Sequence, residues 1–265
     1  QHFFDHVAYS LSNASRSFIL GLSKKFGNSP VVGETEGYYK QINRFSAAFA
    51  FLTDVSMLVL GGSLKRKETL SARLGDILSS LYLASTALKY YEDMGDKEAD
   101  LPLVHWACQT LIFEAQESFH QILSNFPNKI IASLLRCLIF PTGRKIKGPS
   151  IETTLKIGTL ISRNTSTRDN LCRGIYLKDE PTNHLAIMQH ALELYEVVYP
   201  IKAEVMTARK KGLIEGHTFE ELVAAAENAD IITKEQANQL LEYDQVTLDI
   251  INVDDFSEEE LAKIH

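Results

Sequence analysis

The chain has 265 residues, of which 45% are hydrophobic and 23% are charged, so it can bury a sizeable core and lacks the composition of a disordered protein. Its net charge of −7 is split unevenly: residues 213–265 contain 14 acidic and 2 basic side chains, whereas residues 1–212 contain 25 basic and 20 acidic ones. Binding to nucleic acid needs a concentrated basic excess, so we expect no nucleic acid among the partners.

The three cysteines are far apart in the sequence and odd in number. Cys108, Cys137 and Cys172 therefore offer neither a disulfide framework nor paired metal ligands, which favours a reducing, cytoplasmic compartment. The chain begins with Gln1 and no signal-peptide pattern follows, so we interpret it as a fragment of a longer protein.

Helical periodicity dominates the first half of the chain. Residues 41–60 are apolar nearly all round and predict a central, buried helix that stops at Gly61-Gly62. The length of this run and the presence of Asp54 argue against a membrane span. Apolar residues three and four positions apart predict further amphipathic helices over 67–91 and 103–126.

The second half is predicted to be helical as well. Prolines and glycines interrupt residues 140–167, which predicts an irregular connection with one short helix near 151–161. A long helix is expected after Pro181, with a kink at Pro200. The sequence thus predicts an all-α fold, a multi-helix bundle in which long amphipathic helices are followed by smaller C-terminal helices.

The acidic C-terminal part is predicted to form short, ordered helices. It contains three capping-box patterns, in which a hydroxyl caps a backbone N–H and the residue three positions along returns a hydrogen bond. The patterns are Thr218-x-x-Glu221, Thr233-x-x-Gln236 and Ser257-x-x-Glu260. We therefore divide the chain into a helical bundle over 1–97, a helical extension over 98–212 and an acidic short-helix tail over 213–265.

No sequence pattern points to a catalytic or metal site. Dinucleotide, Walker-loop and zinc-protease patterns are all missing from the sequence. Glu117-x-x-His120 has the spacing of one di-iron ligand pair, but the chain has no second Glu-x-x-His to face it. We therefore expect these two residues and Glu114 to form a polar helix face.

Isolated titratable residues are expected to have structural roles. His105, His184 and His190 are interpreted as histidines with a hydrogen-bond partner rather than as ligands or bases. Arg73 and Asp76 are three positions apart on an otherwise apolar helix, which predicts an ion pair along that helix.

The segment 128–147 is the strongest candidate for function. It joins an apolar helix pattern to a basic fringe, and no acidic residue occurs between Glu117 and Glu152. An interfacial helix needs this combination, because its hydrocarbon enters the acyl boundary and its cations meet anionic headgroups. An ordinary buried helix followed by a solvated basic loop is the alternative. The candidate membrane or anion contacts are Lys129, Arg136, Arg144, Lys145 and Lys147.

Several long runs of sequence resemble a known family. The densest begins Leu70-Ser71-Ala72-Arg73-Leu74-Gly75-Asp76 and continues to Ser85, and another is Asp100-Leu101-Pro102-Leu103-Val104-His105-Trp106. Further runs cover residues 38–50, 54–68, 125–128, 140–144, 167–171 and 251–256. From about Phe4 to Phe256, the chain resembles the C-terminal region of the large bacterial FadE-type, long-chain acyl-CoA dehydrogenase, the flavoenzyme of the first step of fatty-acid β-oxidation.

The resemblance implies that the parent protein is an oxidoreductase of lipid metabolism that converts acyl-CoA to trans-2-enoyl-CoA. In that family a glutamate removes the α-proton and FAD accepts the β-hydride. The base segment, which reads like Val-Glu-Gly-x-Asn, and the flavin loops lie upstream of this region and have no match here. The resemblance therefore implies FAD in the full-length parent, with no catalytic residue, flavin contact or metal ligand in this fragment.

Three roles stay open for such a region. It could be a non-catalytic helical domain that contacts its own upstream catalytic core and a second copy in a homo-oligomer, and that associates with an anionic surface on the inner membrane. It could instead be an interaction module that recruits other β-oxidation enzymes through the acidic tail. The third possibility is a domain that shapes the acyl-chain site of the parent.

Overall fold

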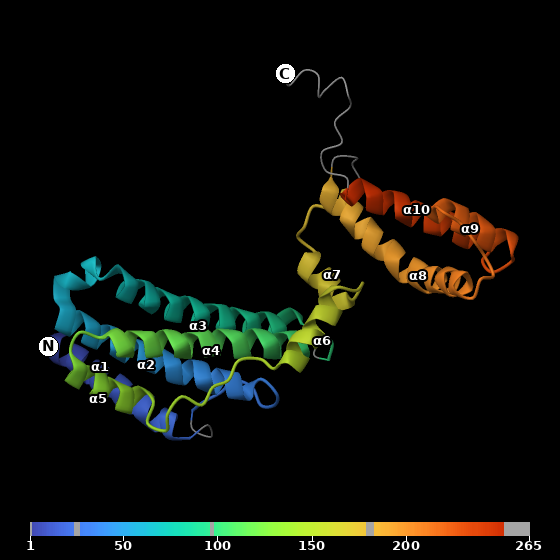
Figure 1. Ribbon diagram of the computed structural model, residues 1–265. Coiled ribbons are helices and arrows are strands. Elements are labelled where there is room, and N and C mark those ends of the chain that lie inside the picture. The colour runs from blue at the N-terminus through green and yellow to red at the C-terminus, as the bar shows by residue number, and fades with distance from the viewer. Residues whose placement is uncertain (1, 24–26, 96–97, 179–182, 252–265) are drawn as a thin grey trace, which may run out of the picture. The chain divides into compact units, whose positions relative to one another are not determined.

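The computed structural model describes residues 2–23, 27–95, 98–178 and 183–251. Over these residues the chain forms ten α-helices and one 3-10 helix, and no strand, which confirms the predicted all-α class (Figure 1). The helices belong to two compact units, residues 1–158 and 159–265, and each unit is described by itself.

Unit 1 is a bundle of long helices. Its elements are α1 (His2–Leu22), α2 (Glu36–Leu60), the 3-10 helix η1 (Gly61–Arg66), α3 (Glu68–Met94), α4 (Leu101–Asn125) and α5 (Lys129–Ile139), and α6 (Ile151–Ile161) begins at its end. Helix α3 packs along α4, and α1 lies along α2 and beside α5. The helices predicted over 41–60, 67–91, 103–126 and 151–161 are confirmed as α2, α3, α4 and α6.

The ends of these helices follow their local sequence. Helix α2 ends at Gly61, whose φ of 50° is easily adopted by glycine and whose N–H donates to the carbonyl of Met57. Helix α5 begins after Asn128, whose side-chain oxygen accepts hydrogen bonds from the N–H groups of Ile130 and Ile131 at 3.0 and 3.1 Å. The short helix α5 is thus fixed at its start by a single cap.

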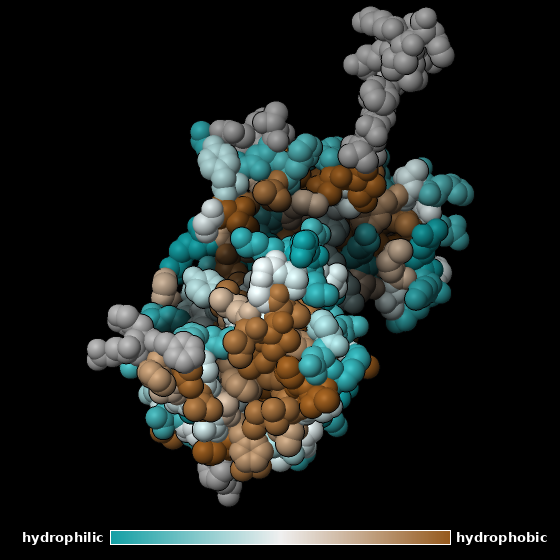
Figure 2. Space-filling model, turned by 90° about the vertical axis from the view of Figure 1, so that its left-hand side faces the viewer, coloured by the Kyte–Doolittle hydropathy of each residue, from teal (hydrophilic) through white to brown (hydrophobic). Residues whose placement is uncertain are grey.

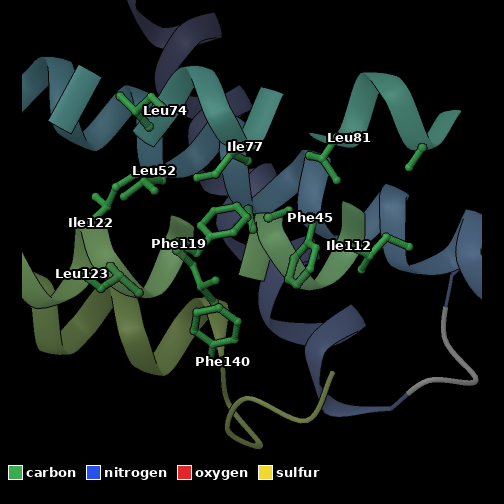
Figure 3. Close-up of a cluster of buried hydrophobic side chains, with 14 of the residues drawn as sticks. Phe45, Leu52, Leu74, Ile77, Leu81, Ile112, Phe119, Ile122, Leu123 and Phe140 are labelled. Atoms are coloured by element: carbon green, nitrogen blue, oxygen red, sulfur yellow. The ribbon is translucent and has the colours of Figure 1, made fainter. Parts of the chain in front are cut away.

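The core of unit 1 is centred on three phenylalanines from three different elements (Figure 3). Phe45 of α2 lies 5.3 Å from Phe119 of α4, and Phe140, directly after α5, lies 6.3 and 6.2 Å from these two rings between centroids. All three side chains are buried. Aliphatic side chains surround them, including Leu52, Leu74, Ile77, Leu81, Ile112, Ile122 and Leu123.

Unit 2 has a separate, smaller core. It contains α7 (Ser166–Cys172), α8 (His184–Lys210), α9 (Phe219–Asn228) and α10 (Lys234–Ile251), and α10 packs against both α8 and α9. The buried side chains include Val198, Val205, Val223 and Leu240. Helix α8 continues through Pro200, and the kink expected there stays a prediction.

Two of the three predicted capping boxes are confirmed. The Thr218 hydroxyl accepts from the N–H of Glu221, whose carboxylate accepts from the N–H of Thr218. Thr233 and Gln236 exchange the same pair of hydrogen bonds at 2.8 and 3.3 Å. The third pattern, at Ser257, lies outside the described residues. The division of the sequence into segments 1–97, 98–212 and 213–265 stays a prediction.

One segment among the described residues is long and apolar enough to cross a membrane by length and composition alone. It is α2 with η1, Glu36–Arg66, whose most apolar window has a mean hydropathy of 1.7 and is 22% buried. The core helix of a soluble protein passes the same test of length and composition, and here Phe45 and Leu52 are wholly buried in unit 1. This property alone therefore does not assign a membrane span to α2.

Truncation of Phe119 to alanine should destabilise unit 1 strongly. The substitution would leave a cavity between Phe45 and Phe140, which costs about 3–5 kcal/mol in a well-packed core. Urea unfolding followed by circular dichroism would measure the loss. Leu155→Ala, at an exposed position of α6, is the matched control and should change the free energy of unfolding by less than about 1 kcal/mol. Equal stability of the two variants would contradict the assigned core.

Candidate functional site

Helix α5 presents apolar side chains on two opposite faces. Ala132, Leu135 and Ile139 are buried in the core, as an ordinary core helix requires. On the outer face, however, Ile130 is 83% exposed and Leu134 is 60% exposed. The core-helix alternative therefore describes only one face of α5, and the other face leaves hydrocarbon in water.

Helix α1 turns its small and polar residues inward. Asn13, Ser17 and Gly21 are buried, and the Ser17 hydroxyl donates to the carbonyl of Leu138 at the end of α5. The outer face carries Phe4, which is 75% exposed, and Leu11, which is 63% exposed. This arrangement is the reverse of the usual amphipathic helix of a soluble protein, in which the apolar stripe faces the core.

The exposed apolar side chains of three helices gather at one end of unit 1. Helices α1 and α5 begin at this end and α2 finishes there (Figure 1). Figure 2 views the molecule from this side and shows a broad hydrophobic area on the part of unit 1 that faces the viewer. We call this surface the apolar end, and its residues are Phe4, Val7, Leu11, Met57, Leu58, Val59, Ile130 and Leu134.

Basic residues flank the apolar end. Lys65 and Arg66 finish η1, Lys67 follows directly, and all three are exposed. Lys129 begins α5, and its ammonium group donates to the carbonyl of Ser124 at 3.2 Å. Reasoning from the sequence finds Lys129 but misses the three cations at and after η1. The signal for them is present in the sequence, because a run of basic residues closely follows the apolar end of α2.

The other four predicted basic contacts do not form one cluster with Lys129. Arg136 is exposed about two helical turns along α5. Arg144 donates to both carboxylate oxygens of Glu117, at 2.8 and 3.1 Å. Lys145 and Lys147 line a cavity between α4 and the first turns of α2, together with Tyr38 and Gln109. Their role as membrane contacts stays a prediction.

No metal centre is found in the part of the chain that the structure describes, where no group of three His, Cys, Asp or Glu side chains is placed to hold an ion. Glu117 instead accepts from Arg144, so this carboxylate forms an ion pair on the surface of α4. The Arg144 and Glu117 side chains are 40% and 34% exposed, and such pairs stabilise a fold by only about 0–1 kcal/mol.

The isolated titratable residues mostly have the structural partners that were expected. The Nδ1 atom of His105 lies 2.8 Å from the hydroxyl of Tyr38, which also accepts from Gln109. His190 lies 3.1 Å from a carboxylate oxygen of Glu242, and Arg73 pairs with Asp76 at 2.7 Å. Burial raises the pKa of Tyr38, and burial also raises the pKa of the Cys108 thiol to about 12, so neither group is activated for chemistry.

Comparison with known proteins agrees with the resemblance seen in the sequence. A family model described as acyl-CoA dehydrogenase, C-terminal, bacterial type, matches residues 1–256. The matched range includes unit 1 entirely and almost all of unit 2. No solved structure matches the chain.

Proposed function

Because the chain belongs to the bacterial-type acyl-CoA dehydrogenase C-terminal family, we propose that it attaches its parent flavoenzyme to the cytoplasmic face of the inner membrane. Membership of this family implies acyl-CoA as the substrate and FAD as the cofactor of the parent. The observation that supports membrane attachment is the apolar end of unit 1 with its flanking cations. Long-chain acyl-CoA is amphipathic and partitions into membranes, so an enzyme held there meets its substrate directly.

The energetics favour a peripheral attachment. Leu58 and Ile130 are 86% and 83% exposed, and moving one such side chain from water into hydrocarbon contributes about 1.5–3 kcal/mol. Each lysine or arginine close to an anionic leaflet adds about 1 kcal/mol. Lys65, Arg66 and Lys129 are placed to do so beside the apolar side chains. The two contributions together are typical of proteins that lie on a membrane without crossing it.

We propose that this chain does not itself hold the flavin. An isoalloxazine ring needs a broad apolar slot, whereas the cavities of unit 1 are bordered by charged and polar side chains such as Arg66, Arg73, Lys145 and Gln109. We therefore derive no redox step from this chain and propose a non-catalytic role for it. Recruitment of other enzymes by the acidic tail and shaping of the acyl-chain site stay predictions.

Glutamate at position 130 should weaken binding of the chain to vesicles. Ile130→Glu places a charge where the proposal puts hydrocarbon, so the affinity for vesicles containing phosphatidylglycerol should fall about tenfold or more in co-sedimentation. Leu155→Glu adds the same charge at another exposed apolar position of unit 1, outside the apolar end, and should leave binding unchanged.

A second pair of measurements separates the electrostatic contribution to membrane binding from the hydrophobic one. Arg66→Glu should reduce binding to anionic vesicles and have little effect on neutral ones, because only the headgroup attraction is removed. Membrane attachment through the apolar end is wrong if Ile130→Glu and Leu155→Glu bind anionic vesicles equally well.

A further role in subunit contacts is favoured by the outer face of α3. Residues 77–88 of this helix contain no charged side chain, although the face away from the core is exposed. Leu78, Tyr82 and Leu83 are all at least half exposed there. A charge-free, partly aromatic surface is typical of a protein interface. We therefore propose that this face contacts the upstream catalytic core or a second subunit.

Glutamate at position 82 should disrupt this contact in the full-length enzyme. Tyr82→Glu would bury a carboxylate in the proposed interface, so light scattering after gel filtration should show a smaller assembly if this face contacts a second subunit, and limited proteolysis should cut faster if it contacts the core. Thr69→Glu adds the same charge in the exposed first turn of α3 and is expected to leave the assembly intact. An unchanged assembly in both variants would show that this face of α3 does not hold two subunits together.

A further inference from the structure

Unit 1 contains a basic cavity beside the first turns of α2, far from the apolar end. Its volume is about 360 Å³, and it lies between the end of α1, the start of α2 and the loop after α5. The side chains of Lys40, Arg44 and Lys145 line it, and no acidic side chain of the described residues does. Backbone at Gly21, Gly37 and Gly143 forms part of the wall, so a ligand could approach the main chain closely.

Arg44 is held firmly in the wall of this cavity without a carboxylate partner among the described residues. Its guanidinium donates to the carbonyl of Ile139 at 2.9 Å and lies over the rings of Phe45 and Phe140, 5.1 and 5.9 Å from their centroids. Its Nε atom is buried and has no acceptor in the described part of the chain. Burial lowers the pKa of Arg44, which means that the surroundings disfavour its charge.

The cavity has a surplus of positive charge. Lys40 is paired with Glu36 at 2.6 Å, so one cation is neutralised from outside the lining. Lys145 is exposed on its loop and forms no ion pair with a described residue. Arg44 and Lys145 therefore leave two uncompensated charges facing one space.

We propose that this cavity binds a phosphate group, held between the Arg44 guanidinium and the Lys145 ammonium. A partly buried guanidinium without a counter-ion is costly, and a bound anion with several oxygens would offset that cost. A phosphate suits the cavity better than a carboxylate, because its larger number of oxygens can accept from Arg44 and Lys145 at once.

The source of the phosphate is expected to be a soluble molecule. Arg44 precedes Leu58 of the apolar end by 14 positions along α2, a helical rise of about 21 Å. A bilayer that contacts the apolar end would keep its headgroups out of reach of Arg44. The choice of a soluble source rests on the proposed membrane attachment, whereas the proposal that the cavity binds phosphate does not.

The sharpest test places a carboxylate at the mouth of the cavity. Gly37 is exposed, a β-carbon added there would meet no atom within 4 Å, and an acidic residue is favourable in the first turn of a helix. Gly37→Asp should therefore fold normally and weaken binding of inorganic phosphate to the full chain about tenfold or more in calorimetry. Gly37→Asn has the same shape without the charge and should bind within about threefold of the parent chain.

A second pair of variants tests the loop. Lys145→Ala should weaken phosphate binding about tenfold, whereas Lys147→Ala, two positions away and outside this cavity, should not. The proposal is overturned if inorganic phosphate shows no saturable binding up to about 10 mM, or if Gly37→Asp and Lys145→Ala bind it as the parent chain does. Binding to phosphatidylglycerol vesicles that needs Lys145, without binding of free phosphate, would overturn the soluble source. These phosphate-binding measurements do not use Ile130→Glu, so their outcome and the outcome of the membrane proposal can be told apart.

Discussion

The contact between Phe45, Phe119 and Phe140 determines most of what unit 1 can do. It joins α2, α4 and the residue that follows α5, three elements that are far apart in the sequence. Ring pairs at these separations stabilise a core by about 0.5–1.5 kcal/mol beyond the area they bury. Phe140 directly follows α5, so its burial fixes the end of that helix and the face that α5 turns to the core. The opposite face, with Ile130 and Leu134, is therefore exposed to solvent.

The same contact also positions the polar features. The loop that carries Arg144 and Lys145 begins directly after Phe140, so the direction of this loop is set by the buried ring. Arg44 is adjacent to Phe45 in sequence and stacks on two of the three rings. A single aromatic cluster therefore holds the hydrophobic surface at one end of α2 and the basic cavity at the other in fixed positions within unit 1.

Sequence patterns predict most helices here, because an apolar repeat of 3.6 residues reports helix position directly. Helices α2, α3, α4 and α6 and two capping boxes follow from that repeat and from local side-chain chemistry. Sequence patterns do not predict contacts between residues that are distant in the chain. Glu117 and Arg144 are 27 positions apart, so their pairing needs the fold. The apolar stripe of α1 is visible in the sequence. That the stripe faces outward depends on the polar partners in α2 and α5 that the small and polar face of α1 contacts.

The inverted faces of α1 have a consequence for how the domain opens. Its inward side is held by polar contacts, among them the hydrogen bond from Ser10 to Asp54, and buries little hydrocarbon. Such an element separates from the rest of a protein at low free energy, well below that of global unfolding. Burying its outer stripe in a partner or a lipid surface would raise that free energy. Docking would then suppress the local opening of α1, and the rigidity of this helix would report whether the enzyme is bound to the partner or the lipid surface.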